Sequence, residues 1–275
     1  MMVINTNVAS LNAQNQLKGT QMSLQKSFER LSSGFRINTA ADDAAGLGIS
    51  ENLKSKIRSY TVAERNTNNA ISMANTAEGG LNQISGIIIR MRELAVQSAN
   101  GDLTSTDRGY LDTEFQLLKE EITRLAETTE FNGKELLAGT ATSFSFQVGI
   151  NTSSFDTISL DFGGVSLDTL GISASSVSGA TAAGATAAID ALDTALQTVS
   201  TNRARFGAAT NRLQVAVSNS QTIRTNLQAA NSAIRDVDVA EETAALARSQ
   251  VLLQAGTSIL AQANQSPQQA LALIG

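Results

Sequence analysis

The side chains of this 275-residue chain that could do chemistry are carboxylates, hydroxyls, lysines and arginines, because the sequence contains no histidine and no cysteine. Without those two residue types the chain can build no histidine-dependent catalytic triad, no HExxH metalloprotease site and no Cys/His zinc site. We therefore expect no catalytic residues, no metal and no cofactor, and we interpret the protein as a non-enzyme.

Two local patterns still deserve a chemical test. Gly133 and Lys134 resemble the end of a phosphate-binding loop, but Thr128 stands five residues before Gly133, where such a loop requires glycine. This pattern therefore predicts only a turn. Arg36, Asp42 and Asp43 could instead form a small ion cluster, and the alternative is a solvated turn. Because an exposed ion pair is worth only ~0 to 1 kcal/mol, such a cluster would set subunit register more than stability.

Charge and hydropathy exclude two classes of partner. The net charge of −5 comes with no basic stripe, which disfavours nucleic acid. No apolar run approaches the roughly 18 residues of a spanning helix, so we expect no membrane insertion. The first residues also lack the basic and apolar segments of a cleaved signal peptide.

The elements that must position these residues are mainly helices. Only 4% of the residues are aromatic and one is proline, a composition that favours long helices with small-residue seams. Residues 44–99 would span ~84 Å as one helix at about 1.5 Å per residue, with a possible bend at Gly79 and Gly80. The apolar residues with coiled-coil spacing in this segment are Ile71, Ala74, Leu81, Ile84, Ile88, Met91 and Ala95.

A second helix and a hairpin should follow. Asn100, Gly101 and Asp102 predict a helix stop, and residues 104–106 can cap a second helix that folds back antiparallel on the first. The apolar face of that second helix comprises Leu111, Phe115, Leu118, Ile122 and Leu125. Period-two alternation over residues 144–150 and 158–162 then predicts a β-hairpin whose apolar side packs on the helices.

The whole chain is therefore expected to be mainly α, a long antiparallel helical bundle or coiled coil with a small β-hairpin and paired N- and C-terminal helices. We predict an N-terminal helical polymerisation segment, the N-terminal part of a rod domain with the hairpin, an exposed Ala/Ser/Thr/Gly connector, the C-terminal helix of the rod domain, and a C-terminal polymerisation segment. Their ranges are 1–43, 44–172, 173–188, 189–235 and 236–275.

The two ends of the chain are the most informative segments. No side chain is charged in residues 1–17 or in residues 249–275, yet both stretches carry apolar residues at helical spacing among Asn and Gln. Such faces suit burial against other protein, because amides find partners there while charges pay for desolvation. We expect the apolar positions to drive polymerisation, and the candidate residues are Leu11, Leu252, Leu253, Ile259 and Leu260.

Several sequence motifs resemble those of bacterial flagellins, here in a short form without outer variable domains. The resemblance covers both terminal regions and most of the predicted bundle, in the right order and at the right separation. The motifs that carry it are INTNVASLNA at 4–13, LSSGFRIN at 31–38, DDAAGL at 42–47, QVLLQAG at 250–256 and AQANQ at 261–265.

The resemblance implies a structural subunit that polymerises into the extracellular flagellar filament for swimming motility. It implies export through the flagellar type III apparatus without a cleaved signal peptide, terminal helices in an inner tube, and the rod domain in an outer tube. The implied partners are other copies of the chain, the flagellar cap, the hook-filament junction proteins and an export chaperone.

One further segment has a double interpretation. RMRELAVQS at 90–98 resembles the flagellin segment that a Toll-like innate receptor recognises, and Glu114 matches a further contact. The resemblance thus makes Arg90, Leu94, Gln97 and Glu114 candidate receptor contacts. The plainer interpretation is a charged helix face that packs in the polymer.

Two rival functions remain open at this point. A hook-filament junction (hook-associated) protein shares the logic of the termini but acts as a minor adaptor. An enzyme displayed on a flagellin scaffold is the other alternative, and the lack of histidine and of an inserted domain argues against it.

Overall fold

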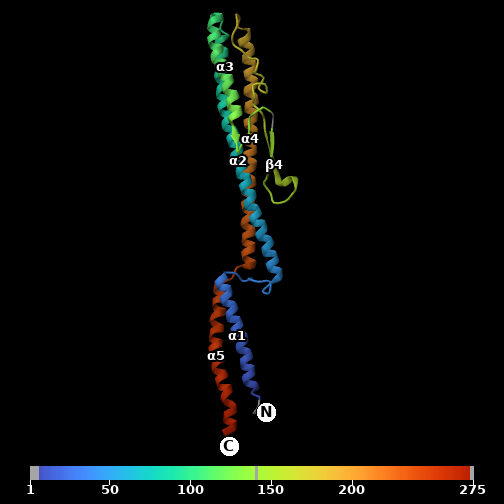
Figure 1. The fold of residues 1–275 in the computed structure, drawn as a ribbon, viewed down its shortest axis with the longest axis vertical. Helices are drawn as coiled ribbons and strands as arrows, with labels where there is room; N and C mark the ends of the chain where they lie inside the picture. Colours follow the sequence, from blue (N-terminus) through green and yellow to red (C-terminus); the bar gives the residue numbers. More distant parts are fainter. Residues whose placement is uncertain (1–5, 140–141, 273–275) are drawn as a thin grey trace. The chain divides into compact units, whose positions relative to one another are not determined.

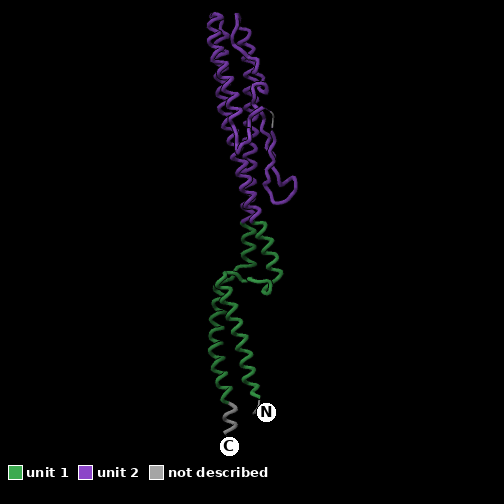
Figure 2. The backbone as a smooth tube through the Cα atoms, viewed as in Figure 1, with its two compact units in different colours: residues 1–57, 225–275 green, residues 58–224 purple. Residues whose placement is uncertain are grey.

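The computed structural model describes residues 6–139 and 142–272. It divides into two compact units, coloured separately in Figure 2. Unit 1 consists of residues 1–57 and 225–275, and unit 2 consists of residues 58–224. The predicted mainly-α fold is confirmed: five long helices account for most of the described chain (Figure 1).

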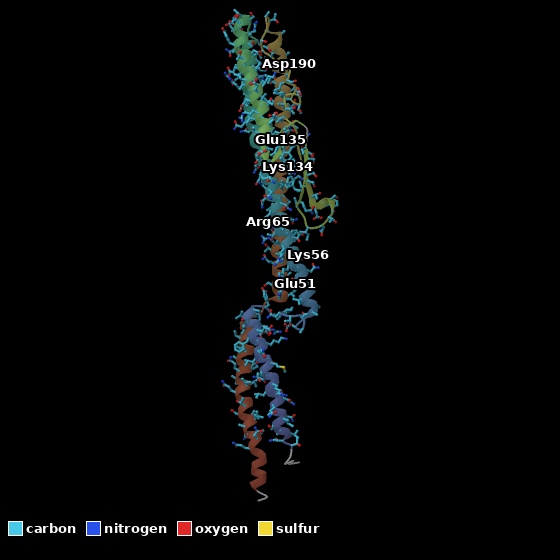
Figure 3. The ribbon with its side chains drawn as sticks, viewed as in Figure 1. Glu51, Lys56, Arg65, Lys134, Glu135 and Asp190 are labelled. Atoms are coloured by element: carbon cyan, nitrogen blue, oxygen red, sulfur yellow. The ribbon has the colours of Figure 1, made fainter. Side chains whose placement is uncertain are left out.

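Unit 1 pairs the first helix of the chain with the last. Helix α1 (Val8–Ser33) packs along α5 (Val239–Ala272), and residues 1–5 and 273–275 of the predicted terminal segments lie outside the described residues. The first turns of α2 and the last turns of α4 complete the unit. The Glu51 carboxylate of α2, labelled in Figure 3, forms a 2.7 Å ion pair with the Arg235 guanidinium of α4. This ion pair links the start of α2 to the end of α4.

Unit 2 is a bundle of three helices with a hairpin on its side (Figure 1). Helix α2 (Ala44–Ser98) is followed by α3 (Ser105–Thr128), and the chain returns in α4 (Ala183–Arg235). Thr104 caps α3 as predicted, because its hydroxyl accepts from the Asp107 N–H while the Asp107 carboxylate accepts from the Thr104 N–H. The largest fully buried side chains include Leu81, Ile84, Ile88, Met91, Phe115, Ile122, Leu192 and Leu213.

The predicted hairpin is also confirmed. Strand β3 (Thr142–Gln147) pairs antiparallel with β4 (Thr157–Phe162), and Phe144 lies opposite Leu160. The Phe162 ring is fully buried and lies 5.0 Å, centroid to centroid, from Phe206 of α4. The apolar side of the hairpin therefore rests on the helices, because two strands alone are only marginally stable in water.

The residues after α3 form a tight turn instead of a phosphate loop. Strands β1 (Glu130–Phe131) and β2 (Lys134–Glu135) pair through Asn132 and Gly133, whose φ angles of 53° and 72° suit a two-residue hairpin turn. The ammonium of Lys134, labelled in Figure 3, lies 4.7 Å from the centre of the Phe144 ring. Residues 130–135 thus form the turn that the failed spacing predicted, and Lys134 contacts the Phe144 ring.

Gly80 has a packing role in α2, which runs as one continuous helix through the pair Gly79 and Gly80. A Cβ atom on Gly80 would lie 2.8 Å from both the Leu137 side chain and the Thr129 hydroxyl. The bare backbone at this position lets the segment after α3 approach α2 closely. The possible bend that the sequence suggested is therefore better understood as a close contact.

Candidate assembly surface

The inner face of the α1–α5 pair is a seam of small and polar residues. Gly256 approaches α1 so closely that a Cβ atom there would lie 2.7 Å from the Leu17 side chain. At the free end of the pair, the Asn7 amide donates to the Ala263 carbonyl at 2.8 Å and the Ser10 hydroxyl donates to the Asn264 side chain at 2.7 Å. Polar side chains of both helices therefore find hydrogen-bond partners between the two helices.

An open groove of about 480 Å³ runs along this helix pair. Its walls come from uncharged side chains of both helices, and no lysine, arginine, aspartate or glutamate is among the described residues that line it. The lining residues are Ala9, Asn12, Ala13, Gln16, Leu17, Thr20, Leu252, Ala255, Gly256 and Ile259. A mixture of methyl, isobutyl and amide groups without charge is suited to another protein surface, since burial there leaves no ion unpaired.

The five apolar residues predicted for polymerisation fall into two groups. Leu11, Leu252 and Ile259 are 50%, 52% and 58% exposed, which leaves them available to another molecule. Leu253 and Leu260 are half-buried and share the three- and four-residue spacing of Gly256, which faces α1. The structure therefore places Leu253 and Leu260 with the α1–α5 seam and the other three on the free surface.

Unit 1 carries further exposed apolar side chains. They lie on both helices of the pair and are Val8, Met22, Phe28, Val239 and Val251, each at least half exposed. Together with Leu11, Leu252 and Ile259, they are apolar side chains on this helix pair that another molecule can cover.

The joint that follows α1 is built from main-chain contacts. Gly34 ends α1 in the left-handed conformation with φ 75°, and its carbonyl accepts from the Val237 N–H at 3.1 Å. The Arg36 N–H donates to the Arg235 carbonyl at 2.6 Å, and the Arg36 guanidinium donates to the Ile234 carbonyl at 2.7 Å. These contacts pin the exit of α1 against the end of α4, and all of them lie within unit 1.

The expected ion cluster of Arg36 with Asp42 and Asp43 is not formed, because the structure gives the three residues separate partners. Arg36 is satisfied by the Ile234 carbonyl, whereas Asp42 pairs with Lys26 of α1 at 2.7 Å. That ammonium, with main-chain N–H groups of the same loop, holds the pKa of Asp42 well below its usual range. Asp43 caps the first turn of α2 by accepting from the Gly46 N–H at 2.8 Å.

The four candidate receptor residues lie on α2 and α3 of unit 2, but not all of them face solvent. The Arg90 guanidinium pairs with Glu114 of α3 and with Glu93, and these two carboxylates raise the pKa of Arg90. Gln97 is exposed. Leu94, however, is only 1% exposed and belongs to the core, so its expected role as a direct receptor contact is corrected to one of packing.

The segment expected to be an exposed connector, residues 173–188, is exposed at most of its positions, but its predicted C-terminal end is corrected. Helix α4 already begins at Ala183, and Val177, Ala185 and Ala188 are buried. Charged side chains on α3 bind the backbone of residues 173–180. The most deeply buried of them is Arg108, only 4% exposed.

Arg108 closes the end of the bundle with three hydrogen bonds. Its guanidinium donates to the carbonyls of Ser98 at 2.9 Å, Asn100 at 3.0 Å and Ala180 at 3.2 Å. One side chain thereby binds two carbonyls at and just after the end of α2 and one carbonyl in the segment that leads to α4.

Asp112 and Lys119 hold the same segment at two further points. The Lys119 ammonium donates to the carbonyls of Ser173 and Ser175 at 2.7 and 3.1 Å. The Asp112 carboxylate accepts from the Val177 N–H and the Ser176 hydroxyl, both at 2.8 Å. Partial burial opposes ionisation of Asp112, but these hydrogen bonds outweigh it and leave its pKa below the usual value.

Two kinds of feature are missing from the part of the chain that the structure describes. None of its helices is both long and apolar enough to cross a membrane. No group of three or more carboxylates is arranged to hold a metal ion among the same residues.

Together these observations define a class of protein: a mainly helical subunit whose first and last helices pair and carry an uncharged, apolar-rich groove. The sequence relationships agree with this class. Residues 4–142 match the bacterial flagellin N-terminal helical region, and residues 189–274 match the bacterial flagellin C-terminal helical region. The chain belongs to the bacterial flagellin family, so it is a structural subunit that self-associates into the extracellular flagellar filament used for motility.

Full-length relatives support this assignment. A flagellin of Halalkalibacterium halodurans is 43% identical, with 99% of this chain and 100% of the relative covered. The flagellar filament 33 kDa core protein of Treponema phagedenis is 40% identical, with the same coverage of both chains.

The hook-associated alternative gains no comparable support. A solved structure of a flagellar hook-associated protein from Vibrio parahaemolyticus covers 70% of this chain and 99% of its own, with a TM-score of 0.58. Its sequence is only 17% identical, so this similarity shows the shared fold alone. The identity to filament subunits over the whole chain therefore decides in favour of the filament.

Proposed function

We propose that copies of the chain join through the charge-free groove of α1 and α5 and the exposed apolar side chains around it. The observation that carries this proposal is the groove itself, which has apolar and amide walls from two helices and no charged lining residue. A subunit that must leave the cell and then polymerise needs a surface that other copies can cover at little desolvation cost.

The energy available from such a surface is ample. If about ten apolar side chains per copy became buried, at about 1.5 to 3 kcal/mol each, assembly would gain on the order of 15 to 30 kcal/mol before entropy costs. Because the contact would join different surfaces of successive copies, it need not close on itself, and a helical filament results.

Replacing Ile259 with glutamine tests the groove at one position. Loss of about 2 kcal/mol of apolar burial should raise the critical concentration for polymerisation roughly 30-fold. The critical concentration is measured by sedimenting filaments grown from short seeds. Ser258→Gln is the matched control, because it exchanges one exposed polar side chain for another on the neighbouring position. An unchanged critical concentration for Ile259→Gln would remove the groove from the assembly surface.

The joint residues have a supporting role in this proposal. Arg36, Asp42 and Asp43 fix the exit of α1 through the Ile234 carbonyl, Lys26 and the first turn of α2. A fixed exit presents the α1–α5 pair in the same way in every copy, so the joint would set the register of subunits.

The family membership also supports a set of cellular partners. We infer that the chain leaves the cell through the flagellar type III apparatus with an export chaperone, and that it assembles beneath the flagellar cap on the hook-filament junction proteins. Cells without a working apparatus should retain the chain, and its release from such cells would contradict this route.

Recognition by the flagellin-sensing Toll-like receptor of hosts is a further proposal. Its support is the exposed face of Arg90, Gln97 and Glu114, which keeps the candidate side chains on the surface while Leu94 supports them from the core. A purified monomer should activate receptor-bearing reporter cells, and inactive monomer would exclude this partner.

A further inference from the structure

The loop that joins β3 to β4 carries the most exposed large apolar side chain among the described residues, Phe155, at 94%. It stands in a short 3₁₀ turn, Ser154–Asp156, at the tip of the hairpin. The hairpin strands rest on the helices of unit 2, whereas this tip projects from them (Figure 1). The fold therefore uses Phe144 and Phe162 in its packing and leaves Phe155 without a role inside the chain.

Hydrogen bonds within the loop hold the backbone of the hairpin tip in place. The Asp156 carbonyl accepts from the N–H groups of Val148 and Gly149 at 2.8 and 2.9 Å. The Gln147 amide donates to the carbonyls of Gly149 and Asn151 at 3.1 and 2.7 Å.

Two further features beside Phe155 stabilise the conformation of this loop. The Ser153 hydroxyl accepts from the Phe155 N–H at 3.3 Å. Gly149 leaves room for the side chain of Asp156, because a Cβ atom at Gly149 would overlap that carboxylate. Since the loop is already ordered, covering Phe155 would cost little additional conformational entropy.

The surroundings of Phe155 point to protein as the covering surface. From Leu136 to Phe155 the sequence carries no charged side chain, the same pattern as in the terminal assembly segments. An open groove of about 400 Å³ lies between the loop and α2, and it includes Val62 and Ile150. Val62 is itself 45% exposed. An uncharged tip with a projecting phenyl ring and an adjoining apolar groove matches the composition of protein–protein contacts.

We propose that Phe155 is an inter-subunit contact, buried in the filament against a second copy of this chain. The second copy is the occupant because the family is self-associating and each copy presents an identical tip. This inference rests on self-assembly but not on the groove of α1 and α5, since Phe155 belongs to unit 2 and that groove to unit 1.

The absence of cysteine from the sequence makes a direct test possible. Phe155→Cys introduces a unique thiol into the full chain, and about one part of it is mixed with twenty parts of wild-type chain before seeded polymerisation. The rate of maleimide labelling is then compared between monomer and filament. Because thiol reactivity follows access, we expect labelling in filaments to be slower by about tenfold or more. Glutathione added to the filament suspension controls for the reagent.

A second variant identifies what covers the position. Phe155 is replaced by the photoreactive benzoylphenylalanine, which retains an aromatic ring, and the variant is copolymerised with ¹⁵N-labelled wild-type chain. Illumination of filaments should yield crosslinked pairs of one light and one heavy chain, and illumination of monomer should yield none. Labelling at the monomer rate in filaments, or crosslinks confined to one chain, would overturn the proposal.

The outcomes separate this inference from the proposed assembly surface. If the groove of α1 and α5 is not used, Ile259→Gln still polymerises normally while the labelling at position 155 remains measurable. If Phe155 is not covered, the thiol reacts freely in filaments whose assembly still depends on Ile259.

Discussion

A chain lacking residues 249–275 should form no filaments at concentrations where the full-length chain polymerises completely, even with seeds. The deletion removes the half of the groove contributed by Leu252 and Ile259 and the half-buried Leu253 and Leu260 that face the seam. Even a few side chains at about 1.5 to 3 kcal/mol each amount to many powers of ten in affinity. Sedimentation and negative-stain electron microscopy measure the loss.

The deletion has an internal control in unit 2, which contains no residue after 224. The thermal unfolding of this unit, followed by circular dichroism, should remain at the full-length midpoint. Hollow filaments grown from the truncated chain would show that residues 249–275 are dispensable for assembly and would contradict the role of the groove.

Replacing Arg108 with methionine should destabilise unit 2 by about 3 kcal/mol or more, the second large effect we expect. The substitution removes three hydrogen bonds and leaves the carbonyls of Ser98, Asn100 and Ala180 to find other partners. The Ser98 carbonyl is buried, and an unpaired buried carbonyl costs about 1 to 3 kcal/mol. The two part-buried bonds to Asn100 and Ala180 involve a charged donor and add to the loss, although water can replace some of them. Chemical denaturation of the monomer measures the change.

The position of the effect matters as much as its size. Amide hydrogen exchange should accelerate first in residues 173–182, the segment that Arg108 and Lys119 hold. Arg212→Met is the control, because Arg212 is exposed on α4 and its loss should leave stability nearly unchanged. Equal stability of the two variants would mean that Arg108 does not close the bundle.

The sequence predicted the elements with strong periodic signals. Helices α2 and α3 begin and end close to the predicted residues, because the turn at Asn100–Asp102 and the cap at Thr104 are local signals that the fold does not override. The β3–β4 hairpin was predictable for the same reason. Its alternation of apolar and polar residues matches the face that packs on Phe206.

The segment before α4 could not be predicted because its partners are distant in sequence. Low-complexity Ala, Ser and Thr carry little local signal, whereas the groups that order the segment, Arg108, Asp112 and Lys119, sit on α3. Charged residues on a helix are ordinarily solvated, so nothing in their spacing marked them as buried. Only the three-dimensional arrangement shows that their side chains satisfy the backbone of residues 173–180.

The candidate site was likewise predictable from the sequence only in part. That the uncharged ends would carry exposed apolar residues followed from composition, but their assignment to two faces of the α1–α5 pair required the geometry of Gly256 and Leu17. Leu94 was assigned with its exposed neighbours because the resemblance to flagellins covers the whole segment 90–98, yet it faces the core. Arg36 is close in sequence to Asp42, but its guanidinium donates to the Ile234 carbonyl of α4, and the Asp42 carboxylate pairs with Lys26.

The most direct test of the central claim is the structure of the filament itself, determined by electron cryomicroscopy at a resolution that shows side chains. We predict that Leu11, Leu252 and Ile259, each at least half exposed in the single chain, are buried against other copies in the filament. If Leu252 and Ile259, which line the groove, instead face solvent while other surfaces hold the copies together, the groove of α1 and α5 is not the assembly surface.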